Sequence, residues 1–492
     1  MSTRNEQKKK SKKGFTVIVI LTALLIMAVG VLTVLTLLDV ISPLKPADSV
    51  DTYFENPRVR SESVMVLLLM GCALPCVVLW LGFSLIPRRR KDGEPDETIE
   101  VEGIRKAEEE KKEEPEEKDG KKKKKLSPEA KKNAVRFSTL SALDREMASQ
   151  PNVAYNERIS LEEFCNRFRA FAAHERRLYY DIDDIRRFVA SLGVSPIIIM
   201  QGMSGTGKTS LATVFGDFVM NKSNVIPIQP MWKERSDMIG YFNEFTERFN
   251  EMPLLCTLYE ANYSRNLYVT ILDEMNIARV EYYFADFLSL LELPDKKDRM
   301  LEVVSDTWAQ DPKLFKGGRL QLPVNMWYIG TANNDDSTFA ISDKVYDRAM
   351  IINLDKKAKP FIAQATAPVR ISIDYWNQLV ANAKETYALS EEQADRLRKL
   401  DAYLVEHFRV TFGNRIMKQI TQYVPLYMAC GGSEEEALDD IIAKKIFRKL
   451  ETQNPVYVRN ASEGLLSFMD DLFGPGSMTQ CREYLKRLQR NV

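Results

Sequence analysis

The sequence contains little of what a metal site or a disulfide framework requires. Its 492 residues include two histidines and six cysteines, and no two cysteines form a CxxC pair. This scarcity argues against a structural zinc site or a set of disulfides, and it favours reduced thiols in a cytosolic domain. Neither sign of charge is in excess, because 69 basic residues balance 69 acidic ones. That balance argues against a protein that binds nucleic acid over its whole surface.

Long uncharged stretches are present near the N-terminal end. Residues 15–38 and 64–87 contain no charged side chain, and each stretch is long enough to cross a bilayer as a helix. The first is longer than a signal-peptide core and ends without a small-residue cleavage site. Basic residues flank the outer ends, which predicts a two-pass membrane anchor over 1–87 with both termini cytoplasmic. Two buried core helices are the alternative, although soluble helices of this length usually have a polar face.

Residues 88–136 are highly charged and lack the apolar side chains of a core, so they predict a flexible linker. Its lysine run, 121–125, is suited to anionic lipid or nucleic acid, and a solvated linker is the simpler interpretation. A helical extension is predicted over 137–190. Within it, Ser160 and Glu163 have the spacing of a capping box that opens a helix.

A complete P-loop follows the apolar run 196–200. A strand that breaks into a glycine-rich turn and then a helix presents backbone N–H groups at the positive end of the helix, where a polyphosphate binds. Lys208 is placed to reach the β- and γ-phosphates, and Thr209 to bring its hydroxyl to Mg²⁺. A chance glycine-rich turn is the competing interpretation. The residues predicted to bind the nucleotide here are Gly202, Ser204, Gly205, Thr206, Gly207, Lys208, Thr209 and Ser210.

Two later strand ends carry polar side chains. One apolar run ends in Asp273 and Glu274, and we predict that Asp273 holds Mg²⁺ while Glu274 orients or deprotonates the attacking water. The run 326–330 leads to Asn333 and its neighbour Asn334, and Asn333 is predicted to contact the γ-phosphate or the water. An acidic pair and an Asn-rich loop are each common alone, so the prediction depends on their combination.

An arginine precedes the last strand-like segment, 350–354. We predict that Arg348 reaches a nucleotide on the next subunit and stabilises charge in the transition state, as an arginine finger does. A surface ion pair with the adjacent Asp347 is the alternative.

Strand and helix patterns alternate from the P-loop to about residue 355. This alternation predicts an α/β core over 191–360, built on a three-layer and mainly parallel sheet. Residues from about 374 onward are predicted to be helical almost throughout, and 361–492 are predicted to form a separate C-terminal helical lid.

Together, residues 202–209, 273–288, 330–333 and 347–348 resemble the AAA+ superfamily. The closer resemblance is to its McrB-like branch, whose best known members are GTP-using motors of modification-dependent restriction systems, and it covers roughly residues 190–450. It implies an AAA+ core, ATP or GTP with Mg²⁺ as cofactors, and a homo-oligomeric ring that is expected to be a hexamer. The residues it assigns are Lys208 and Thr209 to Walker A, Asp273 and Glu274 to Walker B, Asn333 to sensor 1, Arg348 to the arginine finger and Arg415 to sensor 2.

The same resemblance implies two contacts beyond the nucleotide. Arg279 is a second candidate for reaching across a subunit boundary. The insertion 295–323 is predicted to form a β-hairpin, and in this branch a hairpin there faces the ring pore, where substrate passes.

The leading hypothesis is a membrane-anchored AAA+ NTPase whose ring remodels or moves a cytoplasmic partner or substrate. We recognise no pattern of a methyl-base reading domain or of a nuclease, which argues against DNA restriction by this chain alone. The alternatives are a nucleotide-gated membrane scaffold or signalling switch, and a nucleic-acid translocase of a defence system with a separate nuclease. The sequence does not distinguish ATP from GTP, because a P-loop contacts only phosphates.

Overall fold

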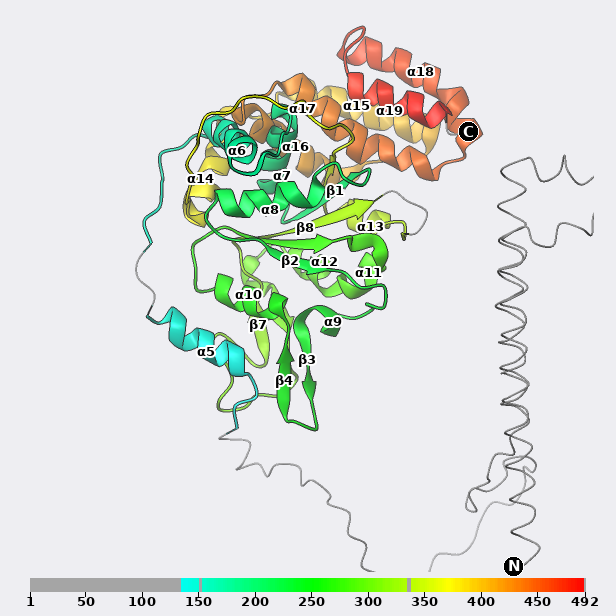
Figure 1. Cartoon of the computed structure of the whole chain (residues 1–492). Coiled ribbons are helices and arrows are strands. Elements are labelled where there is room, and N and C mark those ends of the chain that lie inside the picture. Colours follow the sequence, from blue (N-terminus) through cyan, green and yellow to red (C-terminus); the bar gives the residue numbers. More distant parts are fainter. Residues whose placement is uncertain (1–133, 150–152, 334–337, 491–492) are drawn as a thin grey trace, which may run out of the picture. The chain divides into compact units, whose positions relative to one another are not determined.

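The computed structural model describes residues 134–149, 153–333 and 338–490 (Figure 1). Both predicted membrane helices and the linker up to residue 133 lie outside these residues, so those predictions remain predictions. Within the described part of the chain, no helix combines the length and the apolar character that a membrane crossing needs.

Five parallel strands form the central sheet. Their order across the sheet is β2 (Asn224–Pro227), β5 (Tyr268–Asp273), β8 (Met326–Asn333), β1 (Ile197–Gly202) and β9 (Met350–Asn353). The strand that carries the P-loop therefore lies between β8 and β9, and β8 separates it from the strand that ends in Asp273. The predicted parallel sheet is confirmed.

Both faces of the sheet are covered, as the uninterrupted apolar run of β1 requires. Ile198 and Met200 belong to one buried cluster, and Ile197 and Ile199 belong to another. In Figure 1 the first face lies under α6 (Leu161–Arg176), α7 (Ile182–Leu192) and α8 (Lys208–Phe218), and the second lies over α9 (Ser236–Ile239), α10 (Pro253–Ala261), α11 (Val280–Tyr283) and α12 (Ala285–Leu291). The three-layer prediction is confirmed.

The N-terminal extension is helical and begins earlier than the capping signal at Ser160. Its first helix is α5 (Ser138–Met147). The Ser160 hydroxyl oxygen then accepts a hydrogen bond from the Glu163 backbone N–H at 3.1 Å, which is the half of the predicted capping box that caps α6. Arg136, assigned to the linker by the sequence, is instead buried, because Asp306 and Asp311 bind its guanidinium at 2.6 and 2.7 Å.

Two small antiparallel sheets accompany the main one. The predicted hairpin of the insertion is confirmed by β6 (Met300–Glu302), which pairs with β7 (Arg319–Gln321). A second pair, β3 (Gly240–Asn243) with β4 (Arg248–Glu251), was not predicted. Short helical turns occur at Met275–Ile277, Lys296–Asp298 and α13 (Asp343–Tyr346).

The C-terminal segment is helical, as predicted, but it does not have a separate core. Trp376 contacts Phe164 on α6 and Trp327 on β8, with ring centroids 6.1 and 5.7 Å apart, and one buried cluster continues from the sheet into the lid. Apolar side chains on both partners join the two parts. The lid helices are α14 (Ile373–Thr386), α15 (Glu391–Phe408), α16 (Gly413–Ala429), α17 (Glu434–Ile441), α18 (Pro455–Phe473) and α19 (Thr479–Arg490).

A π-helical turn, Ile442–Ile446, ties the lid to the segment that carries Arg348. The Lys445 ammonium is buried and donates hydrogen bonds to the carbonyl oxygens of Tyr346 and Ala349, both at 2.6 Å. Burial lowers the pKa of Lys445 to about 7, although the charge of Asp347 opposes that shift. Single π-helical turns often mark functional positions, and this one joins lid and core.

We expect the stability of the fold to depend on pH through Lys445. Its pKa lies below the ordinary 10.5, so the unfolded chain binds the proton first as the pH falls towards 7. The stability linked to the neutral form of Lys445 is therefore fully present above pH 10.5, and it is lost progressively as the pH falls to about 7. The unfolding free energy of the wild type, minus that of Lys445→Met, should rise with pH by up to about 1.4 kcal/mol per pH unit. Denaturation of both proteins across this pH range measures the difference.

The matched control is Lys449→Met. Lys449 lies nearer the surface and pairs with Asp347 at 3.6 Å. It should show no comparable pH slope, and an equal slope in both variants would refute the assignment to Lys445.

Candidate functional site

The candidate site lies where β5, β8 and β1 end, at the carboxyl edge of the sheet. Register places Gly202 opposite Asn333 on the paired strands β1 and β8, and Leu272 opposite Gly330 on β5 and β8. Asp273 is the next residue of β5. Parallel sheets bind ligands at this edge, and here the fold gathers three motifs that are far apart in the sequence.

The P-loop has the backbone geometry that its glycines permit. Gly202, Gly205 and Gly207 have φ angles of 142°, 76° and 94°, in the region that favours glycine. A Cβ atom on Gly202 would come within 2.4 Å of the Leu354 carbonyl oxygen, so a side chain there has no room. Of the other predicted loop residues, Ser204 is exposed, the Thr206 hydroxyl donates to the Met203 carbonyl at 3.0 Å, and Ser210 lies in the first turn of α8.

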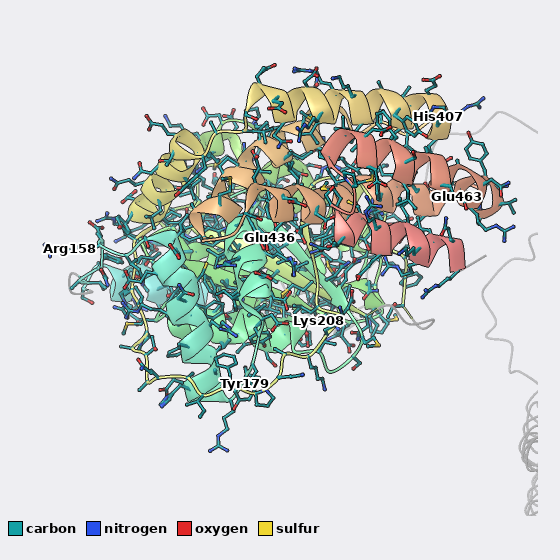
Figure 2. The ribbon with its side chains drawn as sticks, turned by 90° about the horizontal axis from the view of Figure 1, so that it is seen from above. Arg158, Tyr179, Lys208, His407, Glu436 and Glu463 are labelled. Atoms are coloured by element: carbon teal, nitrogen blue, oxygen red, sulfur yellow. The ribbon has the colours of Figure 1, made fainter. Side chains whose placement is uncertain are left out.

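Lys208 lies across the loop that it follows. Its ammonium is buried and donates to the carbonyl oxygens of Gly202 and Met203, each at 2.9 Å. The Tyr180 hydroxyl donates to the Gly207 carbonyl at 3.0 Å and thereby fixes the start of α8 against the chain ahead of α7. Seen from above, Lys208 lies between Tyr179 and the lid residue Glu463 (Figure 2).

Asp273 contacts Thr209, the other residue predicted to hold the metal. Its Oδ1 atom accepts hydrogen bonds from the hydroxyls of Thr209 at 2.7 Å and Thr331 at 2.8 Å. Carboxylate, hydroxyl and phosphate oxygens are the ligands that Mg²⁺ prefers, and it usually takes few of them from protein. The described residues hold no cluster of three His, Cys, Asp or Glu side chains that would bind a metal unaided. This donor set fits a magnesium ion brought with a nucleotide.

Glu274 adopts a backbone conformation that is rare for its residue type. Its φ angle is 52°, in the left-handed region, and its side chain is exposed at the edge of the sheet. The Glu274 backbone N–H donates to the Thr331 hydroxyl oxygen at 2.9 Å. Thr331 therefore holds both members of the acidic pair, a role that sequence reasoning missed although its motif was noted. Strained residues of this kind cluster at functional sites.

Asn276 is a further residue that sequence reasoning missed. Its amide N–H₂ donates to the Asn333 carbonyl and to the Thr338 hydroxyl, both at 3.0 Å. Its Oδ1 atom is buried without a hydrogen-bond partner among the described residues, and both Asn276 and Asn333 line a cavity of about 540 Å³. That volume is ordinary for a small-molecule site. Asn334 lies outside the described residues.

The cavity extends from the carboxyl edge towards the lid. Arg448 and Arg487 line it from the lid side, and Asn353 lines it from the end of β9. An adjoining cavity of about 420 Å³ is also lined by Asn353. Asp181 and Asp184, from the start of α7, line this second cavity. Polar groups from core and lid therefore line both cavities, whereas no residue of the P-loop 202–209 lines either one.

The predicted arginines lie elsewhere. The Arg348 carbonyl accepts a hydrogen bond from the Ser195 hydroxyl at 2.9 Å, just before β1 begins, so Arg348 lies at the edge opposite the P-loop. Arg415 is with it, because both guanidinium groups bind Glu292 at 2.6 Å. The fold therefore does not bring Arg348 or Arg415 to the P-loop of their own chain, and Arg415 does not line that nucleotide site as predicted.

Two further predictions concern the ion pair of Arg348 and the position of Arg279. The alternative pairing of Asp347 with Arg348 is not the observed one, because Asp347 pairs with Lys449 and Arg348 with Glu292. Arg279 is exposed, and its guanidinium lies over the ring of Phe339 at 5.2 Å.

Comparisons with known proteins give limited matches. A family model described as "Domain of unknown function (DUF8727)" matches residues 370–492, nearly the whole predicted lid. A search of curated proteins finds no match. A crystal structure of "a putative ATPase from Cytophaga hutchinsonii" is 13% identical, with 72% of this chain and 96% of that chain covered and a TM-score of 0.40. A full-length MCM homologue from Methanopyrus kandleri is 9% identical, with 59% and 61% covered and a TM-score of 0.33. At these scores no residue role is transferred from either.

We expect Thr331→Val to damage the magnesium site. Thr331 is 2% exposed, and its loss would leave the Glu274 N–H unpaired and deprive Asp273 of one donor. The midpoint of thermal unfolding should fall, as expected for about 1–3 kcal/mol per buried polar group left unpaired. Nucleotide binding should require at least about 5-fold more Mg²⁺, the factor that corresponds to about 1 kcal/mol, which titration of Mg²⁺ at fixed nucleotide measures.

Thr270→Val is the control. Thr270 is equally buried on β5, but its hydroxyl donates to the Met326 sulfur, at 3.5 Å. It should leave the Mg²⁺ requirement unchanged, and a similar change in both variants would mean that Thr331 has no specific role.

Proposed function

We propose that this chain is a membrane-anchored AAA+ NTPase that hydrolyses ATP or GTP with Mg²⁺ in a homo-oligomeric ring, and that it uses the energy to remodel or move a cytoplasmic partner. The observation that carries the proposal is the contact of Thr209 and Thr331 with Asp273 beside the P-loop Lys208. A chance glycine-rich turn would not place a metal-binding pair at the same edge of the sheet.

The phosphates would bind in the loop between β1 and α8. Lys208 now donates to two loop carbonyls, and phosphate oxygens are stronger acceptors for the same ammonium. Backbone N–H groups at the start of α8 supply the remaining donors. Lys208 would thus hold the β- and γ-phosphates from one side.

Hydrolysis would take place between the P-loop and the end of β5. Thr209 and Asp273 would hold Mg²⁺, which neutralises charge on the β- and γ-phosphates. Glu274, exposed beside them, would orient a water and accept its proton as the water oxygen attacks the γ-phosphorus. The bond from that phosphorus to the bridging oxygen breaks, which releases nucleoside diphosphate and inorganic phosphate. Asn333 would contact the γ-phosphate or the water from the end of β8.

The place of two arginines supports the proposed ring. Arg348 and Arg415 are at the sheet edge opposite their own P-loop, so either of them could reach a γ-phosphate only on a second subunit. Such a residue supplied in trans stabilises transition-state charge and makes turnover depend on assembly. The hexamer, the base preference and a pore-facing role for the β6–β7 hairpin remain part of the proposal.

Location and output are proposed from the sequence. The uncharged runs 15–38 and 64–87 would place the core next to the cytoplasmic face of a bilayer. A moving ring fixed there would act on a protein or other substrate that approaches from the cytoplasm. A slow nucleotide-gated switch is the alternative outcome of the test that follows, and nucleic-acid translocation would require salt-dependent binding to DNA or RNA.

We expect Glu274→Gln to abolish steady-state hydrolysis of ATP and GTP while nucleotide binding persists. A fall in turnover of about 100-fold or more is expected for the loss of a general base. Lys208→Ala should instead abolish binding, because it removes the cation that contacts the phosphates. Phosphate release and equilibrium nucleotide binding, measured on the same preparations, separate the two variants. Glu281→Gln, which replaces a carboxylate on α11, is the control and should behave as the wild type.

Arg348→Ala tests the shared site. Mixed with Glu274→Gln subunits, it should recover part of the lost turnover, because each ring then contains some sites with an intact Glu274 and a neighbour with Arg348. A wild type without turnover at any concentration would favour the switch, and turnover independent of protein concentration would argue against the ring.

A further inference from the structure

We propose that Glu292 is a positioning residue that holds Arg348 and Arg415 together, so that both are presented as one pair to the nucleotide of the neighbouring subunit. This inference rests on the proposed function, in which the arginines act in trans. It adds a residue that no sequence pattern indicates, because Glu292 lies outside every motif and follows a short helix.

The geometry of the cluster is simple. One carboxylate oxygen of Glu292, Oε2, binds Arg348 at 2.6 Å, and the other, Oε1, binds Arg415 at 2.6 Å. The three side chains come from different elements, namely the end of α12, the turn before β9 and the first turn of lid helix α16. They are partly exposed, by 30%, 22% and 48% for Glu292, Arg348 and Arg415, so the cluster is accessible from solvent.

Charge explains why the glutamate is needed. Two guanidinium groups this close repel each other, and a carboxylate between them offsets the repulsion. Glu292 caps the C-terminal end of α12, where the helix dipole disfavours a negative charge, so local helix preferences do not account for it. The cluster keeps a net charge of one positive unit from its three groups, which attracts a polyphosphate.

The donors of the cluster suit a phosphate. A guanidinium binds carboxylate and phosphate oxygens through the same planar N–H groups. Arg348 also donates to the Lys344 carbonyl at 2.7 Å, and its buried Nε–H has no hydrogen-bond partner among the described residues. A phosphate from the neighbouring subunit would meet two partly exposed arginines that Glu292 has already aligned.

Other contacts hold the surrounding backbone without Glu292. Gln419, on the same helix as Arg415, donates to the Asp347 carbonyl at 3.1 Å, and Lys445 binds the carbonyls of Tyr346 and Ala349. Loss of the Glu292 charge should consequently release the Arg415 side chain from Arg348 and leave lid and core joined.

The test is Glu292→Gln in the full-length protein, which retains size and removes the charge. At concentrations where turnover per subunit is maximal, kcat for the preferred nucleotide should fall about 10-fold or more, and the affinity of the P-loop for nucleotide should stay within about twofold. Glu392→Gln is the matched control, because Glu392 pairs with Arg396 at 2.7 Å on the lid helix α15, outside the proposed site. It should keep wild-type kcat.

A double-mutant cycle tests whether Glu292 acts through Arg415. Added to Arg415→Ala, Glu292→Gln should cost much less than it does in the wild type, because the pair it holds is already broken. Unchanged or raised kcat in Glu292→Gln, or equal losses in both backgrounds, would overturn the inference. The thermal midpoint and nucleotide binding of each variant establish that it is folded.

Mixed rings separate this inference from the proposed function. Glu274→Gln subunits still offer their arginines to wild-type neighbours, whereas Glu274→Gln/Glu292→Gln subunits should depress the turnover of wild-type neighbours further. If Arg348→Ala keeps full turnover, the shared site itself is wrong. If Arg348→Ala and Arg415→Ala lose turnover while Glu292→Gln keeps it, the shared site stands and the role of Glu292 is refuted.

Discussion

The common direction of the five strands is the constraint on which the site depends. Because β1, β5 and β8 run parallel, their carboxyl ends meet at one edge, and Gly202, Asp273 and Asn333 come together there. The same direction sends the start of β9, with Arg348, to the opposite edge. One geometric rule therefore brings together, within a chain, the residues predicted to bind phosphate and Mg²⁺ and separates them from Arg348 and Arg415.

Short polar contacts then fix what the sheet has gathered. Thr331 holds Asp273 by donating a hydrogen bond and holds the Glu274 backbone by accepting one, so a single buried hydroxyl uses both of its capacities. At the other edge the Glu292 carboxylate binds both Arg348 and Arg415. Both clusters join residues that are distant in the sequence. In both, the bridging side chain contacts residues that the sequence motifs predicted.

The lid belongs to this arrangement more closely than its sequence indicates. Trp376 enters the core on one face, and Lys445 reaches the carbonyls beside Arg348. Lid residues also line the cavity that contains Asn333. The lid therefore contributes residues at both edges of the sheet, Arg448 and Arg487 at the cavity and Arg415 at the arginine cluster.

The sequence by itself determined the parallel α/β core, the P-loop, the acidic pair, the β6–β7 hairpin and the helical lid, because each depends on local periodicity or on motifs within one segment. Only the tertiary structure decided that Arg136 is buried, that the lid shares the core, and that Arg415 lies with Arg348 rather than at its own P-loop. The carboxylates that settle these positions, Asp306, Asp311 and Glu292, are far from their arginines along the chain. An arginine on a polar surface has many acceptable partners, and only the folded chain selects one.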